Sequence, residues 1–278
     1  MKRSKLTSVA ILLLAGACAI DNPIPLTSSV LDEARVAAST GDWDEAWDLL
    51  NDFDSEDLDR ATLVEFHKLA GDVAWERERI TRAVRHYENY LHLRGPGEES
   101  LLVEQRLFQA GLEMLDGDHR TMGIFPNRTR GRTTLQNLAG WSPESPLAAE
   151  ALATVGEYSY ENGFYREAAT DFHLLLSRYR DSEWGDLATF RLGMCGFRRA
   201  MNSPTNLQLI QASVHQLENY QRLYPTGRYL EEVAGALEEL STMEYGYYQY
   251  LGEYYQTVGN DIAAQKYFDI AAELAPNS

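Results

Sequence analysis

Cysteine is scarce in this sequence, which has 2 cysteines among 278 residues. One of them, Cys18, directly follows the leader predicted at residues 1–17; if Cys18 is modified, Cys195 has no partner, so no disulfide framework is predicted. A lone cysteine among helix-forming residues, such as Cys195, is more often a packing residue than a nucleophile. Its thiol is therefore not expected to be reactive.

Motifs of enzymes and metal sites are also lacking. The 6 histidines are scattered without an H-E-x-x-H pair, so no zinc site is predicted. The G-x-S-x-G, glycine-rich phosphate-loop and G-x-G-x-x-G patterns are absent as well. The acidic run "NDFDSEDLDR" does not follow the calcium-loop rule, because Asp57 stands where glycine is needed and Leu63 where glutamate is needed. We expect a non-enzyme with no metal and no cofactor.

Long hydrophobic runs are missing too, and the apolar run at 9–14 is far too short to cross a bilayer. Three basic residues precede this run and small residues follow it, so residues 1–17 are predicted to be a secretory signal. The stretch "LAGAC" at 14–18 resembles the bacterial lipobox, which implies that Cys18 becomes the lipid-modified first residue. The alternative is an ordinary signal with a chance cysteine beside it.

The residues after the lipobox bear on location. Ala19 follows the cysteine, where aspartate would retain an enterobacterial lipoprotein at the inner membrane. By that resemblance, the chain is expected at the outer membrane, lipid-anchored on its periplasmic face. The two prolines in "NPIP" favour an extended backbone, so residues 18–28 are predicted to be a tether.

Basic residues are few, with 25 Lys and Arg against 42 Asp and Glu and a net charge of −17. Removal of residues 1–17 takes away three basic and no acidic residues, which leaves 22 against 42 and a net charge of −20. Such a surface is a poor partner for nucleic acid. It favours basic or neutral protein surfaces.

The sequence does contain a repeat. Its last stretch, "YYQYLGEYYQTVGNDIAAQKYFDIAAELAP", fits the tetratricopeptide (TPR) pattern W-x2-L-G-x2-Y…A-x3-F…P at each position, with tyrosine in the tryptophan slot. The glycine and alanines allow two helices to approach closely, and the larger side chains fill the space between them. The matching residues are Tyr248, Leu251, Gly252, Tyr255, Ala264, Phe268, Ala271 and Pro276.

The same signature recurs upstream. A glycine and an alanine twelve residues apart, followed by an aromatic residue, occur as Gly71/Ala83/Tyr87 and Gly156/Ala168/Phe172. A turn glycine five residues before the alanine occurs as Gly41/Ala46, Gly163/Ala168 and Gly259/Ala264. Two stretched units open at Gly111 and Gly193, the first with an insertion at 116–132 that its prolines and glycines predict to be a loop. The sequence therefore predicts an all-α fold, a TPR α-solenoid of about five to six helix pairs over 29–278.

Connecting segments such as "YRDSEWGDLATFRLG" and "YPTGRYLEEVAGALEEL" join the units, and "MEYGYYQYLGEYYQTVGN" opens the last one. With the lipobox, these segments resemble the BamD-like lipoproteins, the family of component D of the β-barrel assembly machinery. The resemblance covers roughly 28–278 and implies a non-catalytic periplasmic scaffold that binds the barrel assembly subunit and unfolded outer membrane proteins. The chain departs from the family in its stronger acidity and its Arg-rich insertion. The alternative is a general TPR interaction lipoprotein of the cell envelope.

In TPR proteins the first helix of each pair lines the binding groove with positions that the packing signature leaves free. Acidic and aromatic side chains at these positions suit an extended client with aromatic and basic character. The alternative is that aromatics such as Tyr160 and Phe197 pack against the next helix. Transferred by register, the groove residues are Lys68, Asp72, Trp75, Glu76, Glu157, Tyr160, Glu161, Met194, Phe197, Arg198, Glu253 and Gln256.

The insertion carries the only basic cluster of this acidic chain, at Arg120, Arg128, Arg130 and Arg132. This cluster has two interpretations. It could contact an acidic partner or lipid head groups. Alternatively, it is a solvated loop that balances nearby Asp and Glu residues.

Overall fold

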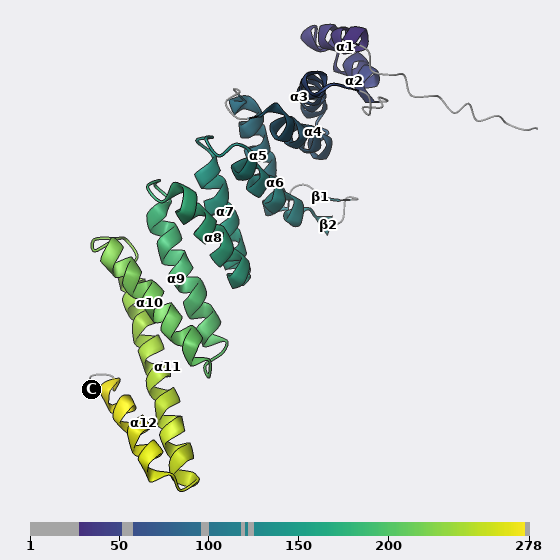
Figure 1. Cartoon of the computed structure of the whole chain (residues 1–278). Coiled ribbons are helices and arrows are strands. Elements are labelled where there is room, and N and C mark those ends of the chain that lie inside the picture. The colour runs from purple at the N-terminus through teal and green to yellow at the C-terminus, as the bar shows by residue number, and fades with distance from the viewer. Residues whose placement is uncertain (1–27, 52–57, 96–99, 118–119, 122–124, 276–278) are drawn as a thin grey trace, which may run out of the picture.

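The computed structural model describes residues 28–51, 58–95, 100–117, 120–121 and 125–275. Within them the chain forms twelve helices and one short pair of strands (Figure 1). The strands pair antiparallel. The elements are α1 (Ser28–Ser39), α2 (Trp43–Asn51), α3 (Arg60–Glu76), α4 (Ile80–Arg94), α5 (Leu101–Asp116), β1 (Arg120–Thr121), β2 (Phe125–Pro126), α6 (Arg128–Trp141), α7 (Ala148–Glu161), α8 (Tyr165–Tyr179), α9 (Gly185–Met201), α10 (Leu207–Leu223), α11 (Leu230–Thr257) and α12 (Asp261–Glu273).

Consecutive helices pack as six pairs, from α1–α2 to α11–α12, and the pairs follow one another in an extended stack (Figure 1). The prediction of an all-α solenoid is confirmed. The core is divided along the stack into four clusters of buried side chains, each formed by helices of neighbouring pairs. Each pair therefore completes its neighbour's core, as expected for a repeat protein.

The signature glycines lie where two helices of a pair come closest. A side chain at these positions would collide with a large side chain of the second helix, since an added Cβ would lie only 2.4–2.7 Å from it. The predicted register is therefore observed in five pairs, with leucine in place of the aromatic residue in the two stretched units. The facing residues are Gly71 and Tyr87, Gly111 and Leu135, Gly156 and Phe172, Gly193 and Leu217, and Gly252 and Phe268.

The turns inside the pairs also follow the predicted pattern. Gly41, Gly163 and Gly259 have φ angles of 80°, 79° and 76°, a left-handed conformation that glycine adopts at no steric cost. In the turn between α3 and α4 the same position is occupied by Glu78, with a φ of 57°. A side chain in this conformation is strained, because its Cβ approaches the following carbonyl oxygen.

Replacing Glu78 by glycine is expected to stabilise the protein by about 1 kcal/mol, because relief of the left-handed strain outweighs the extra freedom of the unfolded chain. The urea midpoint measured by circular dichroism should rise. Gly163→Ala, the reverse change in the α7–α8 turn, should lower it by a similar amount. An unchanged or lower midpoint for Glu78→Gly would contradict the assignment of strain to this turn.

The insertion at 116–132 differs from the predicted loop. Helix α6 begins at Arg128, so Arg128, Arg130 and Arg132 are helical. The loop prediction is wrong for these residues because Gly131 lets α6 cross α5 at close range, where its backbone packs against Gly111. Tertiary packing thus extends the helix through residues whose composition alone favours a loop.

Helix α3 begins at the last residue of the acidic run "NDFDSEDLDR", which does not follow the calcium-loop rule. The Asp59 carboxylate accepts hydrogen bonds from the backbone N–H groups of Ala61 and Thr62, at 2.9 and 3.2 Å. Asp59 is therefore an N-cap that satisfies the free donors of the first turn. Residues 52–57 of the run lie outside the described residues.

The predicted signal peptide, residues 18–27 of the predicted tether with Cys18, and the helix-ending Pro276 also lie outside the described residues, whereas Ser28, placed at the end of the tether, begins α1. Cys195 is buried on α9, and burial raises the pKa of its thiol to about 12. The thiol therefore stays protonated at neutral pH, which makes it a poor nucleophile and fits a packing role.

Candidate protein-interaction face

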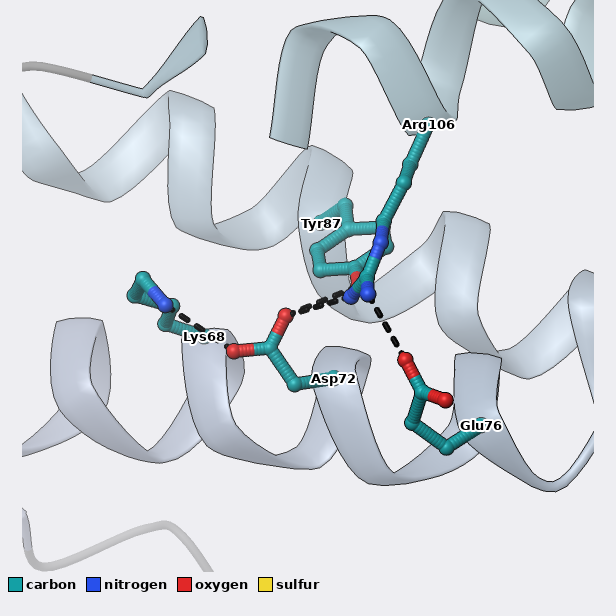
Figure 2. Close-up of polar contacts among 5 residues, drawn as sticks. All are labelled: Lys68, Asp72, Glu76, Tyr87 and Arg106. Atoms are coloured by element: carbon teal, nitrogen blue, oxygen red, sulfur yellow. Dashed lines mark hydrogen bonds and ion pairs between the residues drawn. The ribbon is translucent and has the colours of Figure 1, made fainter. Parts of the chain in front are cut away.

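Arg106 on α5 ties the first helix of one unit to the first helix of the previous unit (Figure 2). Its Nη1 donates to Oδ1 of Asp72 at 2.9 Å and to the hydroxyl of Tyr87 at 2.6 Å. Its Nη2 donates to Oε1 of Glu76 at 2.7 Å. Nζ of Lys68 reaches the other oxygen of Asp72 at 2.9 Å. The three charged residues predicted on α3 are thus brought together, but in an internal network.

Tyr87 completes this network from α4. Its hydroxyl donates to Asp72 at 2.9 Å while it accepts from Arg106. Burial raises the pKa of the Tyr87 phenol, and the Asp72 carboxylate raises it further, so the hydroxyl keeps its proton. Trp75 is half-buried, with its ring centroid 5.3 Å from the Arg106 guanidinium carbon, which suits a cation–π contact. The Trp75 ring therefore supports the arginine and is only partly available to a client.

A second bridge of the same kind joins α7 to α9. Nε and Nη2 of Arg191 donate to the two carboxylate oxygens of Glu157, at 2.6 and 2.8 Å. The guanidinium carbon of Arg191 lies 4.4 Å from the ring centroid of Tyr160, and Arg198 donates to the Tyr160 hydroxyl at 3.4 Å. Paired, bidentate geometry of this kind orients both side chains firmly.

Two predicted groove residues belong to the core. Met194 and Phe197 on α9 are 8% and 5% exposed and pack within the cluster formed by α9, α10 and α11. Their assignment to the groove is wrong, because α9 is covered on both sides by neighbouring helices. For Phe197 the alternative interpretation, packing against the next helix, is correct.

The remaining predicted residues reach the surface. Glu161, Arg198, Glu253 and Gln256 are exposed, on α7, α9 and α11. The structure does not join these residues into one pocket with the α3 network. The face therefore consists of two internally paired networks, around Arg106 and around Arg191, flanked by a few exposed polar side chains.

Arg106 and Arg191 are residues that the sequence analysis missed. Each stands on the first helix of a unit and reaches back to the preceding unit. Arg106 and Arg191 stand at different distances from the signature glycines of their own units, but each lies 34 residues after the carboxylate that it binds, and that carboxylate directly follows a signature glycine. Their effect is to neutralise carboxylates that were predicted to attract a basic client.

Two arginines of the insertion, Arg130 and Arg132, form bridges as well. Arg130 makes an ion pair with Glu88 of α4, and Nη2 of Arg132 lies 3.1 Å from Oδ2 of Asp171 on α8. The two carboxylates are buried, with 8% and 3% of their side chains exposed. The interpretation that these arginines balance nearby acidic residues is correct, because both form ion pairs. The prediction that they lie on a solvated loop is wrong, because both lie on α6. Arg128 is exposed.

A histidine pair lies between α3 and α4. Nδ1 of His67 is 3.0 Å from Nδ1 of His86, in a cavity of about 270 Å³ that Arg82 and Arg85 also line. Burial lowers the pKa of His86 to about 4, helped by the charges of His67, Arg85 and Arg82, and burial with Arg85 also lowers the pKa of His67. Both imidazoles are therefore neutral at pH 7.

Because of this histidine pair, we expect the protein to lose stability in mild acid. The unfolded chain takes up a proton at His86 near pH 6.5, whereas the folded chain does so near pH 4, so the stabilising contribution is present above 6.5 and is lost as the pH falls. The free energy of unfolding should drop by about 1–2 kcal/mol between pH 7 and pH 5. Urea titrations at the two pH values should show a smaller drop for His86→Gln, whereas His173→Gln, at an exposed site on α8, should match wild type. An equal drop in all three proteins would contradict the prediction.

No group of three or more His, Cys, Asp or Glu side chains among the described residues is placed to hold a metal ion. Among those same residues, no helix has the length and apolar character needed to cross a membrane.

Comparisons with known proteins return solved structures of low similarity. No family model matches the sequence, and no curated protein does. Similar solved structures include the apo form of RapI (12% identity, TM-score 0.32, 88% of this chain and 96% of that chain). They also include the C-terminal part of a TPR repeat-containing protein from Cytophaga hutchinsonii (11%, 0.32, 90% and 83%) and a tetratricopeptide repeat protein from Parabacteroides merdae ATCC 43184 (14%, 0.30, 90% and 93%). Scores of this size add nothing about function.

Proposed function

We propose that this chain is a non-catalytic protein-binding scaffold of the BamD-like kind, anchored by lipid on Cys18 at the periplasmic face of the outer membrane. Its partners are the barrel assembly subunit and unfolded outer membrane proteins. The observation that supports a binding role is the stack of six helix pairs. Within it Arg106 joins the first helices α3 and α5, and Arg191 joins α7 and α9. Such a stack presents an extended, pre-ordered surface to a protein partner.

The proposed location rests on the sequence. The lipobox-like stretch before Cys18 and Ala19 after it support lipidation and export to the outer membrane. The connecting segments and the tyrosine-rich last unit support the barrel-assembly role over a general envelope scaffold. The net charge of −20 without residues 1–17, from 22 basic and 42 acidic residues, favours a basic or neutral partner surface.

The assembly role is tested by affinity purification from detergent-solubilised envelopes, comparing wild type with Cys18→Ser. We expect wild type to recover a large β-barrel protein that carries periplasmic repeat domains, and Cys18→Ser to recover less of it, because the unlipidated chain is not held at the membrane. Recovery of other envelope proteins in its place would move the function to the general TPR scaffold. Equal recovery by both proteins would count against the lipid anchor.

The groove is tested with an extended peptide that carries aromatic and basic side chains. Trp75→Ala and Tyr160→Ala also remove packing, so the exposed Glu161 gives a cleaner test. Glu161→Lys should weaken binding roughly two- to fivefold, the effect of one exposed charge, as measured by fluorescence anisotropy. Glu218→Lys, an exposed charge reversal on α10, should leave the affinity unchanged. Equal affinity for Glu161→Lys and wild type would argue against a client on α7.

A further inference from the structure

Helix α11 carries one apolar stripe along its whole length. Its members are separated by steps of three and four residues, which places them on the same face of the helix, as in the seam of a coiled coil. The stripe runs from the start of α11 to the first residue after its end. Its members are Val233, Ala236, Leu240, Met243, Tyr247, Tyr250, Tyr254 and Val258.

The first half of this stripe is covered by the solenoid. Val233 and Leu240 are fully buried, and Ala236 is 4% exposed, in the cluster that α11 shares with α9 and α10. Met243 packs at the edge of that cluster. No buried residue of any of the four core clusters among the described residues comes after Leu240. The apolar interface with the solenoid therefore ends near Met243, where Gln211 of α10 still donates to Glu244 at 2.7 Å.

Tyr247 is half-buried, and from Tyr250 onward the stripe is open. Tyr250, Tyr254 and Val258 are 63%, 52% and 56% exposed. Figure 1 shows the end of α11 extending past α9 and α10, with α12 as its neighbour. Large exposed side chains that continue a buried interface are typical of a surface that another molecule covers.

Helix α12 does not cover this face. It packs on α11 at Gly252, whose backbone meets the ring of Phe268. At 100° per residue, Gly252 points to the opposite side of α11 from Tyr254. On the α12 side, Tyr248 and Tyr255 stack on Tyr267, with ring centroids 6.3 and 5.4 Å apart. Helix α12 therefore covers the Gly252 face of α11 and leaves the apolar stripe uncovered.

The charges of α11 identify the kind of occupant. The helix contains no lysine, arginine or histidine, and of its six glutamates Glu244 and Glu253 lie within residues 243–258. A second copy of the chain would bring the same acidic helix against this one, and an anionic membrane surface would be repelled in the same way. A partner helix with basic residues beside an apolar stripe complements both the acidic charge and the apolar surface of α11.

We propose that residues 243–258 of α11 form a docking surface for a basic amphipathic helix of a partner protein, which continues the seam begun by α9 and α10. The surface spans about 23 Å, so about four turns of partner helix cover it. Tyrosines suit this role because each ring contributes a large apolar area while its hydroxyl still reaches solvent. The proposal goes beyond the groove on α3 and α7 and does not depend on a role in barrel assembly.

The test uses the full chain with Cys18→Ser, so that no detergent competes for the probe. The probe is a labelled synthetic peptide of about 18 residues, long enough for the 23 Å surface, with leucines at alternating three- and four-residue spacing and lysines beside them. One control peptide has the same composition in scrambled order, and another has glutamates in place of the lysines. Fluorescence anisotropy measures the affinity, and circular dichroism checks that each protein variant keeps its helix content.

Tyr250→Ser/Tyr254→Ser is expected to weaken binding of the amphipathic lysine peptide about tenfold, the scale of losing two aromatic contacts. Val36→Ser/Phe164→Ser, which changes two side chains of similar exposure elsewhere, should leave the affinity unchanged. Neither control peptide should bind comparably.

Several results would overturn the proposal. These are equal binding of the scrambled peptide, equal loss in the Val36/Phe164 variant, or no binding by wild type. Self-association of the chain, or binding to zwitterionic lipid vesicles, that is lost in Tyr250→Ser/Tyr254→Ser would assign the surface to a second copy or to a membrane.

Discussion

Replacing Arg106 by alanine is expected to destabilise the second and third helix pairs by about 3 kcal/mol. The side chain is only 16% exposed and satisfies Asp72, Glu76 and the Tyr87 hydroxyl together. Its removal leaves a half-buried Asp72 carboxylate with Lys68 and the Tyr87 hydroxyl as its remaining partners. The cost is therefore mainly the loss of the arginine from two partly buried carboxylates, of which Asp72 keeps only weaker compensation.

Urea unfolding and amide hydrogen exchange would measure this effect. Exchange should accelerate in α3–α6 and change little in α9–α12, because a repeat protein transmits stability mainly between neighbouring units. Arg35→Ala is the matched control. Arg35 pairs with Asp32 and Glu65, but all three side chains are more than half exposed, so the expected loss is only about 0.5 kcal/mol. Equal losses for the two variants would show that the Arg106 bridge does not stabilise the stack.

Arg106→Ala also bears on the proposed groove, because it frees the Asp72 and Glu76 carboxylates. If a client with basic side chains lies along α3, a variant that remains folded should bind it more tightly than wild type. In wild type the arginine occupies the position that a basic client side chain would take. The Arg106 bridge therefore lowers the affinity for a basic client while it fixes the arrangement of the two units.

Gly131→Ala is expected to destabilise the protein by about 3 kcal/mol, near the upper end for overpacking. An added Cβ would lie 2.7 Å from the Gly111 carbonyl oxygen, 2.8 Å from Cβ of Met114 and 2.9 Å from the backbone nitrogen of Leu115. Two of these atoms belong to the backbone of α5, so no side-chain rotation relieves the collision. The two helices must move apart, which opens the core around Leu135.

Gly140→Ala on the same helix is the control for this prediction. An added Cβ at Gly140 meets no atom within 4 Å, so the variant should gain about 0.5–1 kcal/mol from the better helix propensity of alanine. Thermal unfolding of both variants should move in opposite directions. If Gly131→Ala were as stable as Gly140→Ala, the close crossing of α5 and α6 would be wrong.

Much of the candidate site depends on contacts that no local pattern reveals. The register correctly placed Asp72 and Glu157 on first helices, but it could not show that Arg106 and Arg191 reach back from the following units to neutralise them. Each arginine lies 34 residues after its carboxylate, a full repeat length, so the pair is not part of any pattern within a single helix. Met194 was misplaced for a related reason, because the burial of α9 depends on how α10 and α11 cover it.

In the tyrosine-rich last unit, too, the sequence predicted some contacts and the tertiary structure decided others. Its TPR spacing predicted the α11–α12 pair and the contact of Gly252 with Phe268, and both are observed. The spacing did not show that the preceding segment joins the first helix of this unit into one helix, Leu230–Thr257. That continuity carries the apolar stripe beyond the end of the solenoid and leaves Tyr250 and Tyr254 uncovered.

The sequence by itself determined the helix pairs, because glycine, alanine and aromatic residues at fixed spacing admit one close packing of two neighbouring helices. It also determined the left-handed turns, because glycine adopts a positive φ without strain. Only the tertiary structure decided which charges remain available and which faces are covered. These depend on side chains that meet across units, at distances along the chain that vary from one unit to the next.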